Sequence, residues 1–119
     1  TQKAGKEEQG TDVGLISFDQ FKEVDLRVAE ITGAEKIKKS DRLLKLTVNA
    51  PEVRTIVAGL AEFYAPEELI GKQVIIAANL KPTKLMGVTS HGMVLAAKDG
   101  DTLVLATISA PVKAGSKVA

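Results

Sequence analysis

The chain has 119 residues, of which 45% are hydrophobic, 26% charged and 3% aromatic. This length suits one domain with a single core. With 16 basic and 15 acidic residues the formal charge is +1, so the total charge does not point to a polyanionic partner. The chain has no cysteine, which excludes disulfides and thiolate sites, and its single histidine excludes a histidine-rich metal site. We therefore expect no cofactor and no metal.

The polar beginning of the chain points to a cytoplasmic module. No apolar run approaches the roughly 20 residues of a membrane helix, and the first residues lack the apolar core of a secretory signal. Residues 1–15 are mostly polar, so we expect a flexible tail or linker before a domain of residues 16–119. The chain begins at Thr1 and not at methionine, which leads us to expect a piece of a longer protein.

A short helix is predicted to begin after Ser17. Ser17 and Gln20 have the spacing of a capping box, and Phe18, Phe21 and Val24 recur at helical spacing. We expect the two phenylalanines to plug one end of the core.

Alternation of apolar and polar residues predicts a series of strands. They cover residues 26–31 (bent near Gly33), 44–48, 53–58, 74–78, 93–97 and 103–107. Asp99-Gly100 predicts a tight hairpin turn, and Pro66 with Gly71 as a stop predicts one or two helical turns. Residues 108–119 are predicted to form an extended arm. This pattern favours an all-β fold, a small closed barrel in preference to a sandwich.

The sequence offers no catalytic constellation. Ser90 and His91 are adjacent, so on a strand they point to opposite faces and make a poor nucleophile–base pair. The segment 87–92 has the glycine spacing of a phosphate loop but lacks its Lys and Ser/Thr. Glu67 and Glu68 suit the start of a helix dipole. We therefore expect that this domain is not an enzyme.

Basic residues are unevenly distributed. Seven basic residues stand against four acidic ones over residues 27–54, namely Arg27, Lys36, Lys38, Lys39, Arg42, Lys45 and Arg54 against Glu30, Glu35, Asp41 and Glu52. Residues 79–93 hold Lys81 and Lys84 and no acid. One basic face suits contacts with nucleic-acid phosphates, whereas residues 36–39 suit a solvated loop equally well. Both alternatives stay open on charge alone.

The placement of the aromatic residues narrows the class of ligand. Phe18, Phe21, Phe63 and Tyr64 all fall outside the predicted strands. Barrels that grip single strands stack the bases on aromatic strand residues. Recognition of the phosphates and shape of a folded RNA needs no such platform. We therefore favour structured RNA over single-stranded DNA.

The loop predicted at residues 79–93 is unusual for its exposed apolar residues. Leu85 and Met86 stand beside its lysines, and Pro82 stiffens it. It also suits an ordinary long connection, and for Leu85 and Met93 we expect packing into the core.

Several motifs together resemble a known family. In chain order they are Phe21–Val28, Asp41–Leu46, Arg54–Gly59, Pro66–Gly71, Asn79–Pro82 and Leu85–Met93. Through them, residues 16–119 resemble the tRNA-binding domain at the C-terminus of bacterial methionyl-tRNA synthetases, which also occurs in free-standing dimeric tRNA-binding proteins and in eukaryotic synthetase-associated cofactors. The resemblance implies a five-stranded oligonucleotide-binding (OB) fold barrel with short helices and a C-terminal extension. It also implies binding to the outside of tRNA by shape, and a homodimer whose interface includes the C-terminal extension.

The resemblance also implies which residues contact tRNA. They are Asn79, Lys81, Lys84, Ser90 and Met93 in the segment between strands, and Arg27, Arg42, Lys45 and Arg54 on or near the barrel face. Phosphate neutralisation is expected from Lys81, Lys84, Arg42 and Lys45. Asn79 and Ser90 are expected to hydrogen-bond the backbone or hold the loop, and Met93 to give an apolar contact or a loop anchor.

Two positions depart from the family pattern. Thr83 stands where many relatives have Arg, which removes a phosphate contact. His91 stands where Glu or Gln is usual and adds positive charge only when it is protonated.

Three functional hypotheses follow. The leading one is non-catalytic tRNA binding by an appendage tethered to a synthetase catalytic domain, where it raises the local concentration of tRNA. The second is a free-standing dimeric tRNA-binding protein, which differs only in what precedes Thr1. The third is a protein-interaction or chaperone module on the same barrel, favoured by the near-neutral charge and the Leu85/Met86 pair.

Overall fold

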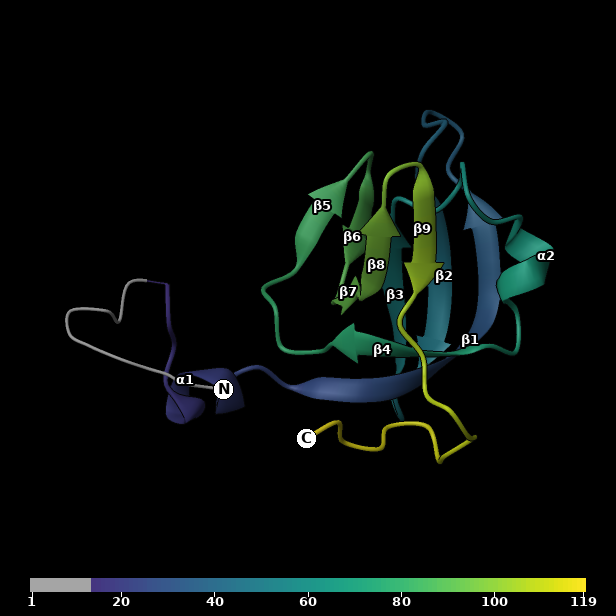
Figure 1. Cartoon of the computed structure of the whole chain (residues 1–119). Coiled ribbons are helices and arrows are strands. Elements are labelled where there is room, and N and C mark those ends of the chain that lie inside the picture. Colours follow the sequence, from purple (N-terminus) through teal and green to yellow (C-terminus); the bar gives the residue numbers. More distant parts are fainter. Residues whose placement is uncertain (1–13) are drawn as a thin grey trace.

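The computed structural model of the chain describes residues 14–119, so the predicted tail lies almost entirely outside the described residues. The elements in chain order are α1 (Phe18–Lys22), β1 (Leu26–Lys36), β2 (Leu44–Asn49), β3 (Val53–Ala58), α2 (Pro66–Leu69), β4 (Gln73–Ala77), β5 (Thr83–Leu85), β6 (Val88–Ser90), β7 (Met93–Val94), β8 (Ala96–Asp99) and β9 (Thr102–Leu105). Five strands form one antiparallel sheet in the order β3-β2-β1-β4-β7, and β5–β6 and β8–β9 form two hairpins (Figure 1). No helix in residues 14–119 has the length and apolarity needed to cross a bilayer.

The sheet curls because β1 is long enough to pair with two strands in succession. Its residues 26–30 pair with β4, and its residues 30–36 pair with β2. The register shifts between Ile31 and Gly33, which is the signature of a β-bulge. A bulge bends the strand and increases its twist. The bend predicted near Gly33 is therefore confirmed.

The barrel is nearly closed by contacts of β3 with Ser90, the last residue of β6, and with His91 after it. The backbone N–H of His91 donates to the carbonyl of Thr55 (2.8 Å). The backbone N–H of Val57 donates to the hydroxyl oxygen of Ser90 (2.9 Å), so a side chain replaces a ladder bond at this seam. The all-β barrel predicted from the strand pattern is confirmed.

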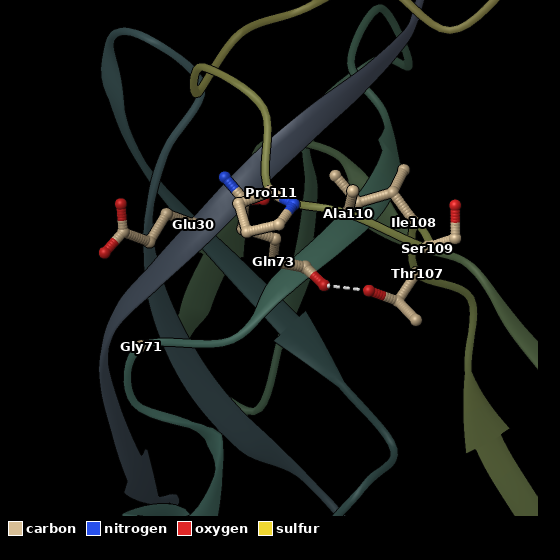
Figure 2. Close-up of a pocket in the computed structure, with 8 residues that line it drawn as sticks. All are labelled: Glu30, Gly71, Gln73, Thr107, Ile108, Ser109, Ala110 and Pro111. Atoms are coloured by element: carbon tan, nitrogen blue, oxygen red, sulfur yellow. Dashed lines mark hydrogen bonds between the residues drawn. The ribbon is translucent and has the colours of Figure 1, made fainter.

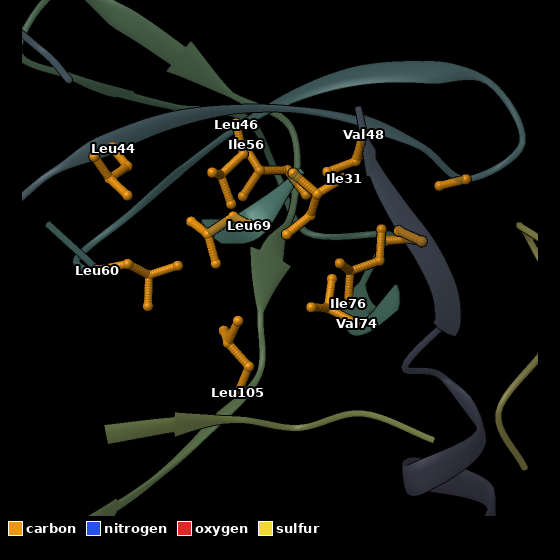
Figure 3. Close-up of a cluster of buried hydrophobic side chains, with 13 residues drawn as sticks. Ile31, Leu44, Leu46, Val48, Ile56, Leu60, Leu69, Val74, Ile76 and Leu105 are labelled. Atoms are coloured by element: carbon orange, nitrogen blue, oxygen red, sulfur yellow. The ribbon is translucent and has the colours of Figure 1, made fainter. Parts of the chain in front are cut away.

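The core lies inside the curled sheet and follows the predicted alternation. In β2, Leu44, Leu46 and Val48 are fully buried while the residues between them are partly exposed. Leu69 of α2 and Leu105 of β9 also belong to the cluster (Figure 3). The remaining buried members are Ala29, Ile31, Ala50, Ile56, Leu60, Val74, Ile76 and Ala78. The short helix predicted after Pro66 is therefore confirmed, and it adds Leu69 to the core.

The structure differs from the predicted strands in one region. The predicted loop of residues 79–93 contains the β5–β6 hairpin, and the predicted strand 93–97 is divided into β7 and β8. The division occurs at Leu95, whose backbone N–H donates to the carbonyl of Ile75 and whose carbonyl accepts from the N–H of Ala106. The chain therefore changes its pairing partner at this residue, from β4 to the segment around β9.

Helix α1 forms as predicted but does not enter the core. The backbone N–H of Gln20 donates to the Ser17 hydroxyl (3.1 Å) and that of Ser17 donates to the Gln20 side-chain carbonyl (2.8 Å), which completes the capping box. However, Phe18 is 72% exposed and Phe21 is 41% exposed. The expectation that the two phenylalanines plug the core is wrong, because α1 stands outside the barrel (Figure 1).

The C-terminal arm is extended as predicted and lies along β1. The backbone N–H of Val28 donates to the carbonyl of Ser116 (2.8 Å), and that of Gly115 donates back to Val28 (2.7 Å). Arg27 and Lys117 form an antiparallel bridge one residue further on. The arm therefore pairs with the edge of β1 that is opposite β4, and Val28 is only 2% exposed.

Gln73 ties the arm to β4 at a second place. Its side-chain amide donates to the carbonyl of Val112 (2.5 Å) and accepts from the N–H of Val112 (3.1 Å), as a strand residue would. The hydroxyl of Thr107 donates to the backbone carbonyl of Gln73 (2.6 Å; Figure 2). The hollow between Gln73 and Pro111 contains Glu30 and no basic residue, so it offers no site for a phosphate.

Gly115→Ala should detach this arm. Gly115 has φ +90°, and an added Cβ would lie 2.5 Å from Cδ and 2.8 Å from N of Pro51. We expect a loss of about 2 kcal/mol in the free energy of unfolding, measured with urea. The matched control is Gly59→Ala, where an added Cβ meets nothing within 4 Å. Equal stability of the two variants would contradict the packing described for the arm.

Candidate nucleic-acid interface

The β5–β6 hairpin carries exposed positive charge away from the barrel wall. Lys81 precedes β5 and Lys84 lies within it, opposite Thr89 of β6. Both lysines are exposed, and neither forms an ion pair within residues 14–119. Because residues 79–93 contain no acid, this charge is not neutralised locally. The hairpin is thus suited to reach phosphates.

A second basic segment, the loop between β1 and β2, lies at the same end of the barrel, opposite the α1 end and the C-terminus (Figure 1). Arg42 is exposed there, on a turn in which the Ser40 hydroxyl accepts from the N–H of Arg42 (3.2 Å) and Leu43 (3.1 Å). Lys45 is the second residue of β2, and its Nζ lies 3.7 Å from a carboxylate oxygen of Glu35. Two separate basic stretches of the sequence are therefore brought to one end of the molecule.

Arg54 connects the two ends of the segment that carries the hairpin. Its Nη1 donates to the carbonyl of Ala78 (2.7 Å) and to that of His91 (3.1 Å). Its Nε donates to Glu52 (3.0 Å), and its Nη2 also contacts that carboxylate. The side chain is only 16% exposed, so little of its guanidinium group is left open to solvent. Arg54 holds the loop in place and its charge is paired with Glu52.

Arg27 is paired in the same way. Its Nη2 and Nε donate to Asp25 (2.8–3.2 Å), and its Nη1 donates to the carbonyl of Ala50 and to Glu52 (both 3.0 Å). The hydrogen bond from Arg27 is the main cause that lowers the pKa of Asp25, and the hydrogen bond from Arg54 is the main cause that lowers the pKa of Glu52. Two guanidinium groups and two carboxylates thus form a neutral cluster.

The sequence contains a signal for this cluster that composition alone does not reveal. Asp25 and Arg27 are two residues apart, as are Glu52 and Arg54. On an extended chain such residues share a face. Each spacing therefore predicts an ion pair, and the two pairs meet at Glu52.

Asn79 and Ser90 anchor the loop from inside. The Asn79 side chain accepts from the N–H of Asp25 (2.8 Å) and donates to the carbonyl of Glu23 (2.6 Å), so it joins the loop to the junction of α1 and β1. Ser90 is 5% exposed and donates to the carbonyl of Gly92 (3.1 Å). Both side chains hold the loop, which is one of the two roles expected for them.

The apolar residues of the loop lie at the surface, as do the two residues that depart from the family pattern. Met93 is 49% exposed and Leu85 is 37% exposed, so the expectation that they pack into the core is wrong. They remain outside because the hairpin projects from the barrel and β7 is an edge strand of the sheet. Thr83 and His91 are also exposed. In residues 14–119, no group of three or more His, Asp or Glu side chains is placed to hold a metal ion.

These features define a class of protein: a small OB-like β-barrel that presents uncompensated lysines on a strand-connecting hairpin, as nucleic-acid-binding modules do. The sequence model of the family described as "Putative tRNA binding domain" matches residues 26–117. The chain belongs to this family, which confirms the resemblance drawn from the motifs.

Curated relatives of the chain are much longer proteins. The chain is 53% identical over 104 residues to a methionine–tRNA ligase of Thermotoga maritima. This match covers 87% of the chain and 16% of the ligase. A methionine–tRNA ligase of Caldanaerobacter subterraneus is 44% identical over 99% of the chain and 19% of the ligase. The chain thus spans less than a fifth of these relatives.

Solved structures of similar proteins match the whole barrel. A MetRS-related protein from Pyrococcus horikoshii has a TM-score of 0.82 at 40% identity, with 87% of the chain and 97% of that protein covered. A CsaA chaperone protein from Picrophilus torridus has a TM-score of 0.82 at 27% identity, with 88% and 100% covered.

The neutral cluster should make stability sensitive to acid. The folded state lowers the pKa of Glu52 below its ordinary 4.5 and that of Asp25 below 3.8. Their contribution is therefore complete above those ordinary values and is lost as pH falls through the lowered ones. We expect Glu52→Gln to lower stability at neutral pH and to flatten its decline between about pH 5 and pH 3.

Thermal unfolding across that pH series measures the effect. The control is Glu62→Gln, which removes an exposed carboxylate that has no ion pair within residues 14–119. Parallel pH profiles for the wild type and Glu52→Gln would contradict the role given to the cluster.

Proposed function

We propose that this domain binds tRNA without catalysing a reaction, by its phosphates and folded shape. The observation that carries the proposal is the gathering of four basic residues at one end of the barrel, of which only Lys45 has an ion pair within residues 14–119, to Glu35. Lys81 and Lys84 come from the hairpin, and Arg42 and Lys45 come from the segment around the β1–β2 loop. The charges of Arg27 and Arg54 are paired with carboxylates. Arg54 holds the ends of the loop, and Arg27 binds the same Glu52 carboxylate.

The strands support recognition by shape in preference to base stacking. No strand of residues 14–119 contains an aromatic residue, so the barrel wall offers no stacking platform for a single strand. Contacts to phosphates depend on charge and spacing and carry no base sequence. A folded RNA of defined shape is therefore the preferred ligand.

We further propose that the domain acts in the cytoplasm as the C-terminal appendage of a methionyl-tRNA synthetase. The similarity to methionine–tRNA ligases over nearly the whole chain supports this assignment. A tethered binding domain raises the concentration of tRNA near the catalytic body without chemistry of its own. The MetRS-related protein supports the alternative of a free-standing tRNA-binding protein, because the chain covers 97% of it.

We also propose a homodimer formed through α1 and the C-terminal arm. Phe18, Phe21 and Val24 of the α1 region line a mainly apolar hollow with Val118 of the arm, and Lys22 and Lys117 also border it. Leu15, just before α1, is 68% exposed. A second copy would remove this contiguous apolar surface from water. Helix α1 and the C-terminal arm lie at the end of the barrel opposite the hairpin tip (Figure 1), so a dimer formed there would leave the basic residues accessible.

A protein-interaction or chaperone function on the same barrel is the second candidate. The likeness to a CsaA chaperone protein favours it, as do the exposed Leu85 and Met86. Binding to unfolded polypeptide in the absence of any affinity for tRNA would decide for this function.

Lys84→Ala should weaken tRNA binding and reduce its dependence on salt. Loss of one phosphate contact lowers the slope of log K against log[salt] by about 1 and costs roughly three- to tenfold in affinity at low salt. Titration of deacylated tRNA across a salt series measures both. Lys113→Ala is the control, because Lys113 is an exposed lysine of the C-terminal arm, which lies at the other end of the barrel (Figure 1). An unchanged slope for Lys84→Ala would remove Lys84 from the site.

Phe18→Asp should convert the dimer into a monomer. It places a charge in the apolar hollow, and burying that charge against a second copy is strongly unfavourable. Sedimentation at micromolar concentration should give about twice the monomer mass for the wild type and the monomer mass for the variant. Val53→Ser, at a residue 76% exposed outside this surface, should remain dimeric. A monomeric wild type would refute the dimer.

A further inference from the structure

The turn of the β5–β6 hairpin holds a methionine in an unfavourable backbone conformation. Leu85 pairs with Val88, so two residues, Met86 and Gly87, make the turn. Their φ angles are +50° and +84°. Two positive φ angles in a two-residue loop are typical of a type I′ turn, for which Asn-Gly and Gly-Gly are the preferred sequences. Met86 is the one non-glycine residue with positive φ in residues 14–119.

The protein gains little packing from the side chain that causes this strain. Met86 is 50% exposed, although it is a large apolar residue. Leu85, the residue before it on β5, is 37% exposed, so the hairpin carries more than one apolar group into solvent. A strained residue that contributes little to its own fold is typical of a functional site.

The surroundings of Met86 indicate the chemistry of its partner. Lys84 lies two residues away and Lys81 lies at the base of the hairpin, and no acidic residue stands between 79 and 93. A partner of this tip must therefore present negative charge close to an apolar surface. A folded RNA does so wherever a loop base is unstacked, because its phosphate lies beside an exposed base face.

We propose that Met86 packs against an unstacked base of a folded RNA while Lys84 contacts a neighbouring phosphate. The inference rests on the proposed function and adds to it a contact that discriminates between RNAs. A continuous duplex hides its base faces in the stack and offers only phosphates and sugars to this tip. The short turn keeps Met86 at the tip, so little conformational entropy is lost on binding.

The strain at Met86 allows a test in which weaker binding is separated from weaker folding. Met86→Asn and Met86→Gly remove the apolar side chain and relieve the positive-φ strain, so neither should lower the unfolding temperature. Met86→Leu keeps an apolar side chain. Val104→Asn, at a residue 53% exposed on β9, is the control for loss of an exposed apolar group elsewhere.

The probes are deacylated tRNA and a long RNA duplex. We expect Met86→Asn and Met86→Gly to weaken tRNA binding by about three- to tenfold, with an unchanged salt slope and unchanged duplex binding. Met86→Leu and Val104→Asn should bind tRNA as the wild type does. This combination would distinguish an apolar contact from a phosphate contact, because loss of a phosphate contact changes the slope.

Two results would overturn the inference. If Met86→Asn and Met86→Gly bind tRNA as tightly as the wild type while Lys84→Ala binds less tightly, the proposed function stands and the Met86 contact is wrong. If the variants lose only the ability to suppress aggregation of an unfolded protein, the tip contacts polypeptide and not RNA. Absence of tRNA binding by the wild type would instead refute the proposed function itself.

Discussion

The seam between β3 and the segment of residues 78–92 is the constraint on which the rest of the structure depends. The ladder there is incomplete, and the Ser90 hydroxyl and the Arg54 guanidinium supply bonds that backbone groups do not make. Glu52 in turn holds Arg54 and Arg27. Because one carboxylate orients two arginines, closure of the barrel and placement of the hairpin are coupled. The exposed loop of residues 79–93 is therefore held in position by the buried Ser90 and by Arg54, whose charge is paired with Glu52.

The basic residues consequently divide into two groups with different chemistry. Arginine offers a planar fork of donors, which suits several simultaneous bonds to carbonyls and carboxylates, and Arg27 and Arg54 use it inside the protein. Lysine is a mobile point charge on a long stem, which suits phosphates whose positions vary. Lys81 and Lys84 are both exposed to solvent. A near-neutral protein can therefore present one positive end, because part of its charge is cancelled internally.

The two ends of the barrel differ in their chemistry. The hairpin and the β1–β2 loop lie at one end, and α1 with the C-terminal arm lies at the other (Figure 1). The arm is held along β1 by backbone bonds and by Gln73, so its position does not depend on the hairpin. This separation is what allows RNA binding and self-association to be tested by independent substitutions.

The sequence by itself determined the long strands of the barrel, the capping box of α1, the Asp99-Gly100 turn and the family, because each depends on neighbouring residues or on a motif. It also placed uncompensated lysines in residues 79–93. Only the tertiary structure decided which charges are available. Arg54 meets Ala78 and His91 across gaps of 24 and 37 residues, and no local pattern encodes such contacts. Likewise, the exposure of Phe18 and Met93 depends on where the barrel closes, since an apolar residue is buried only if another element packs over it.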